Sequence, residues 1–298
     1  STFGKRQCSM RDGSLTPVQL QAAPSGESQP TTLAVLLSSA AAAASSPLVL
    51  FDRHVAKNGG LSMTKAFEES DCQYYGYQVL EHEFEQMADA LAAADIGGSP
   101  LRICANGHSP VPDTWMEQAR ALGELPQHPR LVTMLRVRRP PDWYQSFYDW
   151  DQVPRMGAGW ANQSSIVDWM PGDLQSRIVL HSHNAVKAQH RELENAPLNE
   201  TECARALDLA GSVELLTTTE EMDRMWPVLR KLSGLELPQK HEHEEPKYFT
   251  PASRLIANDS LTTHSERVAP CDWKLYNAAR QRTEQLLSDW DALVQRQG

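Results

Sequence analysis

A lysine, two glycines and a serine stand between a strand-like stretch and a helix-like stretch. The apolar run 47–51, PLVLF, is typical of a buried strand, and 64–70, TKAFEES, is typical of a helix. A glycine-rich turn at such a junction exposes backbone N–H groups beside the positive end of the helix dipole, which creates an anion site. We therefore predict a phosphate-binding loop that consists of Lys57, Asn58, Gly59, Gly60, Leu61 and Ser62.

This loop differs from the Walker A loop of nucleotide hydrolases. In a Walker A motif the lysine follows the last glycine and is itself followed by Ser or Thr. Here Lys57 precedes both Gly59 and Gly60. On its own, Lys-x-Gly-Gly also suits a plain tight turn, so the loop alone leaves both readings open.

A second candidate anion site lies at 137–150, VRRPPDWYQSFYDW. It follows the apolar run 131–137, so Arg138 would leave the end of a strand at the carboxyl edge of a sheet. Pro140 is suited to the first turn of a helix, which would bring Ser146 round to the same phosphate as Arg138. The alternative is a basic surface turn that precedes an aromatic core helix.

The two segments together resemble the cofactor loops of sulfotransferases that use 3′-phosphoadenosine 5′-phosphosulfate (PAPS). The resemblance is to the Golgi carbohydrate O-sulfotransferase type, such as heparan sulfate 2-O-sulfotransferase-like enzymes. Residues 53–63, RHVAKNGGLSM, are similar to the family's 5′-phosphosulfate loop, with Ala56 in place of proline and Leu61 in place of threonine. The positions of the family's 3′-phosphate segment are filled by Arg138, Pro140, Ser146 and Tyr148.

The resemblance implies a fold, a reaction and roles for residues. The fold would be a P-loop-like three-layer α/β fold, and the cofactor would be PAPS, with no metal. Lys57 and the loop would bind the 5′-phosphosulfate, while Arg138 and Ser146 would bind the 3′-phosphate. The segment 103–110, ICANGHSP, is similar to a His-x-His segment of the family, with Asn106 at its first position and His108 at its second, as the catalytic base.

The expected acceptor is a carbohydrate or a small hydroxylated metabolite. Two other functional classes stay open. A P-loop-type kinase or nucleotide hydrolase would bind ATP with magnesium. A catalytically inactive nucleotide-binding protein would bind the cofactor without turnover. The runs HSH at 181–183 and HEHEE at 241–245 lack partners at metal-site spacing, so solvated loops are favoured there.

Composition limits which binding partners and which cellular location are expected. The net charge of −10 and the absence of a Lys/Arg stripe argue against nucleic acid. Residues 33–51 are rich in Ser and Ala and contain Pro47, which disfavours a membrane span. Three Asn-x-Ser/Thr sequons favour a glycoprotein of the Golgi lumen whose membrane anchor precedes this sequence, with the cytoplasm as the alternative. The cysteines show no CxxC spacing and allow one or two unassigned disulfides; they are Cys8, Cys72, Cys104, Cys203 and Cys271.

The pattern along the chain predicts one α/β domain after a leader. Residues 1–46 are predicted to be a mobile Ser/Ala-rich leader with a short helix near 32–44, and 47–298 a single sulfotransferase domain. Strand-like runs alternate with helix-like runs, which implies a mainly parallel sheet with helices on both faces. The expected strands are 48–51, 73–80, 101–105, 131–137 and 213–218.

Helix boundaries carry their own signals. Asn199 with Glu202 has the pattern of a capping box, and Thr218 with Glu221 repeats it. The last segment, 271–295, is expected to form a long terminal helix. Its packing stripe is predicted to contain Trp273, Tyr276, Leu286, Trp290 and Leu293.

Overall fold

The computed structural model describes most of the chain from residue 46 onward. Residues 32–298 form one compact unit. Leu33 and Leu37, within the range of the short helix expected near 32–44, are helical, and Leu33 is buried. The leader at 1–46 and the domain boundary at 47 stay predictions. The described residues are Leu33, Leu37, 46–76, 81–94, 100–107, 115–152, 166–181, 196–239 and 258–297.

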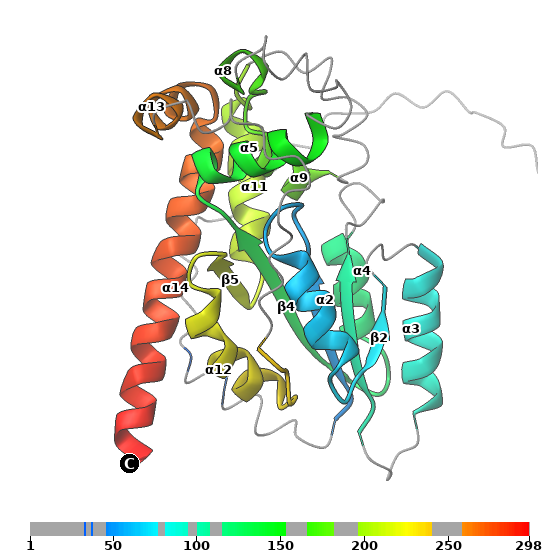
Figure 1. Ribbon diagram of the computed structural model, residues 1–298. Coiled ribbons are helices and arrows are strands. Elements are labelled where there is room, and N and C mark those ends of the chain that lie inside the picture. Colours follow the sequence, from blue (N-terminus) through cyan, green and yellow to red (C-terminus); the bar gives the residue numbers. More distant parts are fainter. Residues whose placement is uncertain are drawn as a thin grey trace, which may run out of the picture. The chain divides into compact units, whose positions relative to one another are not determined.

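Five parallel strands form the central sheet, in the order β2-β3-β1-β4-β5 (Figure 1). Every strand predicted from the sequence is present, although β2 is shorter than expected, and 77–80 lie outside the described residues. The strands are β1 (Leu48–Arg53), β2 (Gln73–Tyr75), β3 (Arg102–Gly107), β4 (Arg130–Val137) and β5 (Leu215–Thr218).

Helices cover both faces of this sheet, which confirms the predicted three-layer α/β fold. Successive residues of a strand point to opposite faces. Val49 and Phe51 of β1 therefore pack with α3 and α4, whereas Leu48 and Leu50 pack with α2 and α12. The helices are α2 (Gly60–Glu68), α3 (Glu81–Ala93), α4 (Trp115–Gly123), α5 (Pro140–Phe147), α8 (Ile166–Trp169), α9 (Leu174–Leu180), α11 (Glu200–Gly211), α12 (Met222–Ser233), α13 (Asn258–Val268) and α14 (Pro270–Gln297), with a π-helix, η1 (Tyr148–Gln152), after α5.

The terminal helix α14 runs beside β5 (Figure 1). The long helix was predicted, but its packing stripe was only partly right. Of the predicted stripe, Leu286 is fully buried, whereas Trp273, Tyr276, Trp290 and Leu293 are half-buried. None of the helices in the described ranges is long and apolar enough to cross a membrane. The fully buried side chains of α14 are Cys271, Asp272, Leu275, Ala279, Thr283, Leu286 and Leu287.

One of the two predicted caps is confirmed and the other is wrong. Asn199 caps α11: its side chain accepts from the N–H of Glu202, and the Glu202 carboxylate accepts from the N–H of Asn199. Thr218 instead ends β5, and α12 begins at Met222 after Glu221, which makes no side-chain capping bond. Tertiary pairing of β5 with β4 outweighs the local capping preference of Thr218.

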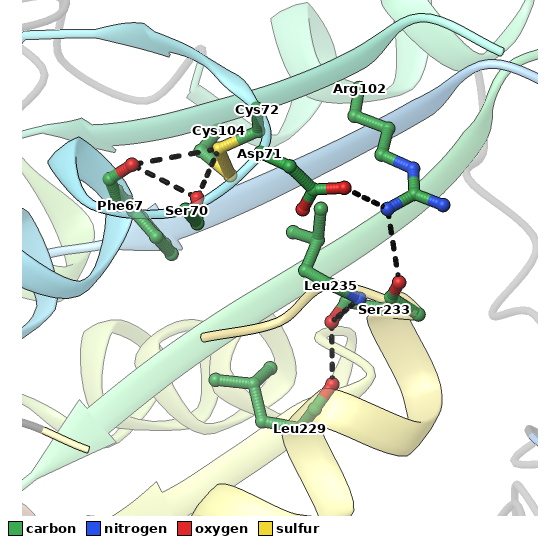
Figure 2. Close-up of a disulfide and its surroundings, with 10 residues drawn as sticks. Phe67, Ser70, Asp71, Cys72, Arg102, Cys104, Leu229, Ser233 and Leu235 are labelled. Atoms are coloured by element: carbon green, nitrogen blue, oxygen red, sulfur yellow. Dashed lines mark hydrogen bonds and ion pairs between the residues drawn. A yellow bond between two sulfur atoms is a disulfide. The ribbon is translucent and has the colours of Figure 1, made fainter. Parts of the chain in front are cut away.

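Two disulfides join segments that are distant in sequence. Cys72, just before β2, is bonded to Cys104 in β3, and Cys203 in α11 is bonded to Cys271 in α14. Figure 2 shows the first bond beside the ion pair of Arg102 with Asp71. These pairs resolve the connectivity that the sequence left open for four of the five cysteines.

Removing the second disulfide should destabilise the fold strongly. The bond closes a loop with a sequence separation of 68 residues. Its loss should lower the free energy of unfolding by about 4 kcal/mol, because the unfolded chain gains loop entropy. Urea denaturation of the double variant Cys203→Ala/Cys271→Ala, compared with the parent protein, measures this difference. A change below about 1 kcal/mol would contradict the expectation.

Candidate functional site

The loops that leave β1 and β4 meet at the carboxyl edge of the sheet. β1 lies between β3 and β4. The chain moves from β1 toward the β2 side, and it returns across β1 when it passes from β3 to β4. In open α/β sheets, ligands bind outside the carboxyl ends of the strands where the strand order reverses in this way. The topology therefore places the predicted phosphate-binding loop, 57–62, at the expected position.

The loop has a sharply bent backbone that ends at the start of α2. Lys57 has φ 65° and Gly59 has φ 73°, so both lie in the left-handed region. The N–H of Asn58 donates to the carbonyl oxygen of Val55 at 3.2 Å, which closes a tight turn. α2 then begins at Gly60, and helix geometry leaves the first N–H groups of a helix without intrahelical acceptors. Gly60, Leu61 and Ser62 supply these groups, as an anion site at a helix start requires.

Packing explains why two glycines stand at this turn. A Cβ on Gly60 would lie 1.9 Å from Cε1 of His54, so any side chain there would collide with the imidazole ring. A Cβ on Gly59 would lie 3.1 Å from Nη1 of Arg136, and the positive φ adds strain for other residues. The pair lets the backbone approach β1 and β4 closely.

Side chains from β4 and α5 donate hydrogen bonds to backbone carbonyl groups of the loop. Nε1 of Trp143 donates to the carbonyl oxygen of Ala56 at 2.7 Å, and Nη1 of Arg136 donates to that of Gly59 at 2.8 Å. Arg136 is itself paired with Asp52 inside the core. Since two carbonyl groups are engaged on this side, the orientation of the loop is set by the sheet and by α5.

Asn58 links the loop to two other elements. Its side chain is fully buried and donates to the carbonyl oxygen of Arg136 at 2.7 Å and to Oε1 of Gln175 at 2.9 Å. The predicted cofactor contact of Asn58 would thus come from its backbone, because its amide nitrogen holds β4 and α9.

Arg138 lies beside the loop, as the second predicted site requires. It follows β4, and Pro140 begins α5 as predicted. Nη1 of Arg138 lies 3.5 Å from the carbonyl oxygen of Lys57. The backbone of Arg138 is held on both sides: its N–H donates to Oε1 of Gln175 at 2.9 Å, and its carbonyl accepts from Nε2 of Gln175 at 3.1 Å. The structure therefore brings Lys57 and Arg138 together from loops about 80 residues apart.

A buried carboxylate supports Gln175 from behind. Asp272, in the first turn of α14, accepts from the backbone N–H groups of Gln175 and Ser176 and from the hydroxyls of Ser176 and Tyr144. Burial and the neighbouring Asp173 raise the pKa of Asp272 to about 7. The four donors fix the start of α9, and with it the amide that positions Arg138.

Lys57 extends toward η1. Its Nζ lies 5.7 Å from the ring centroid of Trp150. Burial raises the pKa of the Asp149 carboxyl, and a hydrogen bond from Gln145 and the charge of Lys57 only partly oppose this shift. Lys57 thus lies next to an indole ring and a buried carboxyl group.

Of the remaining predicted site residues, the structure describes Leu61, Ser62 and Ser146 but not His108. Ser62 is half-buried in the first turn of α2, and Leu61 beside it is also half-buried. Ser146 is half-buried in α5, and its contact with a phosphate stays a prediction. His108 follows the last residue of β3 and lies outside the described residues.

Asn106, at the first position of the predicted His-x-His segment, lies inside the core. It is fully buried in β3, where its Nδ2 donates to the carbonyl oxygen of Gly60 at 3.1 Å and to Oγ1 of Thr64 at 3.0 Å. This side chain ties β3 to the start of α2. It therefore supports the loop from within the core and does not line the edge of the sheet.

Three supporting features were missed by the sequence reasoning. Asp52 and Arg136 each continue an apolar strand, and a charged residue in such a run signals a buried ion pair. Trp150 was included only as part of an aromatic core helix, although it is exposed. Gln175 carries no local signal for its contacts with Arg138, because those contacts arise from tertiary packing.

No group of His, Cys, Asp and Glu side chains suited to a metal ion occurs in the described ranges. Of the two histidine-containing runs, 241–245 lies outside those ranges. His181 belongs to the other, and its carbonyl accepts from Nη2 of Arg53 at 3.0 Å.

Comparison with protein-family models gave no match, and comparison with curated protein sequences found no significant relative. The fold itself defines the chain as a three-layer α/β protein with a parallel sheet. Its function must be argued from the site.

Proposed function

We propose that this protein is a PAPS-dependent sulfotransferase that transfers a sulfuryl group to an acceptor hydroxyl, most simply on a carbohydrate. The observation that carries the proposal is the approach of Arg138 to Lys57, at 3.5 Å between Nη1 and the carbonyl oxygen. Two cationic residues on neighbouring loops complement a nucleotide that carries anionic groups at both its 5′ and 3′ positions. The glycine pair beside them allows close backbone approach to one of those groups.

Each residue then has a defined task in the proposed reaction. When bound, PAPS supplies a sulfuryl group whose bond to the 5′-phosphate breaks as its bond to the acceptor oxygen forms. Lys57 compensates the negative charge on the oxygen that leaves. The first N–H groups of α2 and the hydroxyl of Ser62 bind the 5′ end. Such positioning and charge compensation are the main sources of catalysis in group transfers of this type.

Two further tasks complete the proposal. Arg138 and Ser146 bind the 3′-phosphate, and Gln175 keeps the backbone of Arg138 in register. His108 accepts the proton of the acceptor hydroxyl, because an imidazole with an ordinary pKa of about 6.5 is largely neutral at pH 7. A small hydroxylated metabolite is the alternative acceptor, since the net charge of −10 does not exclude a local binding groove of either kind.

Two observations support a location in the Golgi lumen. Cys72–Cys104 and Cys203–Cys271 are disulfides, which persist in oxidising compartments. Asn199, the acceptor of one sequon, is exposed at the start of α11, where a glycan has room.

Calorimetric titration with 3′-phosphoadenosine 5′-phosphate (PAP) tests the cofactor. We expect the protein to bind PAP and the variant Arg138→Ala to bind it about 10–150-fold more weakly, because a charge-assisted hydrogen bond contributes about 1.5–3 kcal/mol. Arg280→Ala is the matched control, since Arg280 is an exposed arginine of α14 that pairs with Glu284. Its affinity for PAP should equal that of the parent protein.

A parallel titration with ATP and magnesium distinguishes the proposed sulfotransferase from the alternative, a P-loop-type kinase. Preference for ATP over PAP, or an affinity for PAP that Arg138→Ala leaves unchanged, would overturn the proposed function. Binding of neither nucleotide by the folded protein would overturn both loop assignments.

A further inference from the structure

Gln175, near the start of α9, contacts both of the predicted phosphate-binding segments with one side chain. The side chain is fully buried. Its Oε1 accepts from Nδ2 of Asn58 at 2.9 Å and from the N–H of Arg138 at 2.9 Å. Its Nε2 donates to the carbonyl oxygen of Arg138 at 3.1 Å. A single amide group therefore joins the loop after β1 to the residue that follows β4.

The position of Asn58 ties this amide directly to the bend of the loop. Asn58 lies between Lys57 and Gly59, which have φ 65° and 73°, so it stands at the centre of the left-handed turn. Its own amide is fully buried and is also held by the carbonyl oxygen of Arg136 at 2.7 Å. A displacement of the turn would therefore move the donor that Gln175 accepts from.

Burial makes separate movement of the two segments costly. If the loop moved away from Arg138, Oε1 of Gln175 could not keep both donors, and one buried N–H group would lose its acceptor. An unsatisfied buried donor costs about 1–3 kcal/mol, and hydrogen bonds that share a group in a core strengthen one another. The loop and the backbone of Arg138 are thus held as one unit with a fixed spacing.

We infer that Gln175 is a positioning residue that couples the two phosphate-binding segments, so that nucleotide contacts made by one segment strengthen those made by the other. A rigid spacing reduces the ordering that a ligand with two anionic ends must otherwise impose. Such coupling is reciprocal, because each segment affects the other through the same hydrogen bonds. The inference rests on the proposed function, since it takes the two segments to bind the two ends of one nucleotide.

A double-mutant cycle on the affinity for PAP, measured by calorimetry, tests the coupling. Gln175→Met keeps the approximate size of the side chain but removes its amide, so we expect about tenfold weaker binding of PAP. Added to Gln175→Met, Arg138→Ala should weaken binding by less than about threefold, against about 10–150-fold in the parent protein, because residues in one hydrogen-bond network have non-additive effects. Gln285→Met is the matched control. Gln285 is an exposed glutamine of α14 that pairs with Asp289, so Arg138→Ala should keep its full effect there.

Asn58→Ala breaks the same link from the other side and serves as the second variant if Gln175→Met does not fold. It removes the donor on the loop but leaves both bonds between Gln175 and the backbone of Arg138 in place. We expect it, too, to reduce the effect of Arg138→Ala on PAP affinity at least threefold.

The ratio between these affinities separates coupling from a purely structural role. If Arg138→Ala has the same effect in the parent protein and in both variants, the two segments act independently, which overturns the coupling and leaves the proposed cofactor intact. A lower thermal unfolding temperature of Gln175→Met together with additive effects would assign Gln175 to folding alone, which also overturns it. A parent protein that does not bind PAP, or whose PAP affinity Arg138→Ala leaves unchanged, overturns the proposed function itself.

Discussion

Lys57→Ala should lower kcat for sulfuryl transfer by about 10²–10³-fold. Removal of one group that stabilises developing charge in a transition state has effects of this size in other enzymes. Lys57 lies in the left-handed turn before α2, and Arg138 beside it remains in place to bind the nucleotide. The loss should therefore appear mainly in kcat, with a smaller change in the affinity for PAP. Turnover of PAPS with a glycan acceptor, measured beside PAP calorimetry, gives both quantities.

A nearby lysine provides the control for this variant. Lys65 lies in the last turn of α2, where it pairs with Glu68 on the surface. Lys65→Ala should leave kcat within about twofold of the parent value, because exposed ion pairs contribute little. A thermal unfolding temperature of Lys57→Ala far below that of the parent protein would assign Lys57 to folding, and an unchanged kcat would remove it from the reaction.

The second large effect concerns Asp272, which supports the site through Gln175. Its pKa is raised to about 7 in the folded protein from an ordinary value of 3.8, because burial and Asp173 disfavour the charged form. The folded state therefore binds a proton more tightly than the unfolded state. This contribution to stability is complete below pH 4 and is lost as the pH rises through about 7. Its full size is on the order of a few kcal/mol.

Asp272→Asn should remove this pH dependence. The amide does not ionise between pH 4 and 8. Its nitrogen, however, would face groups that donate hydrogen bonds to the carboxyl oxygens of Asp272, so the variant should be about 1–3 kcal/mol less stable at pH 4.5. The difference from the parent protein should shrink as the pH rises. Urea denaturation of both proteins at pH 4.5, 6 and 8 measures it.

An exposed aspartate serves as the comparison. Asp208 lies on the surface of α11, so Asp208→Asn should show the same pH profile as the parent protein. If the profile of Asp272→Asn also runs parallel to that of the parent protein, the titration of Asp272 does not contribute to stability.

The strands and the bend of the predicted phosphate-binding loop were predictable because their signals are local. A run such as Leu48–Phe51 is apolar on both sides, as a strand in the middle of three layers requires. The bend at Lys57–Gly60 is encoded by glycines, one of which adopts a positive φ, while the other packs against His54. The capping box of Asn199 is equally local, and it is confirmed.

Predictions failed or stayed incomplete where contacts with a distant segment outweigh the local sequence signal. Thr218 has a capping pattern, but pairing with β4 makes it a strand residue. The stripe of α14 was read from its large aromatic residues, whereas contact with β5 and α9 buries smaller side chains such as Ala279 and Thr283. The pairing of the cysteines is also set by which strands and helices become neighbours.

The amino-acid sequence by itself determined the alternation of strands and helices, the bend after β1 and the helix start at Pro140, because these depend on neighbours within a few residues. Only the tertiary structure decided that Arg138 approaches Lys57, that Gln175 and Asp272 hold Arg138 in place, and that Trp150 stays exposed beside Lys57. These contacts join residues between 37 and 97 positions apart. Their partners are chosen by the strand order and by helix packing, which no short stretch of the chain encodes.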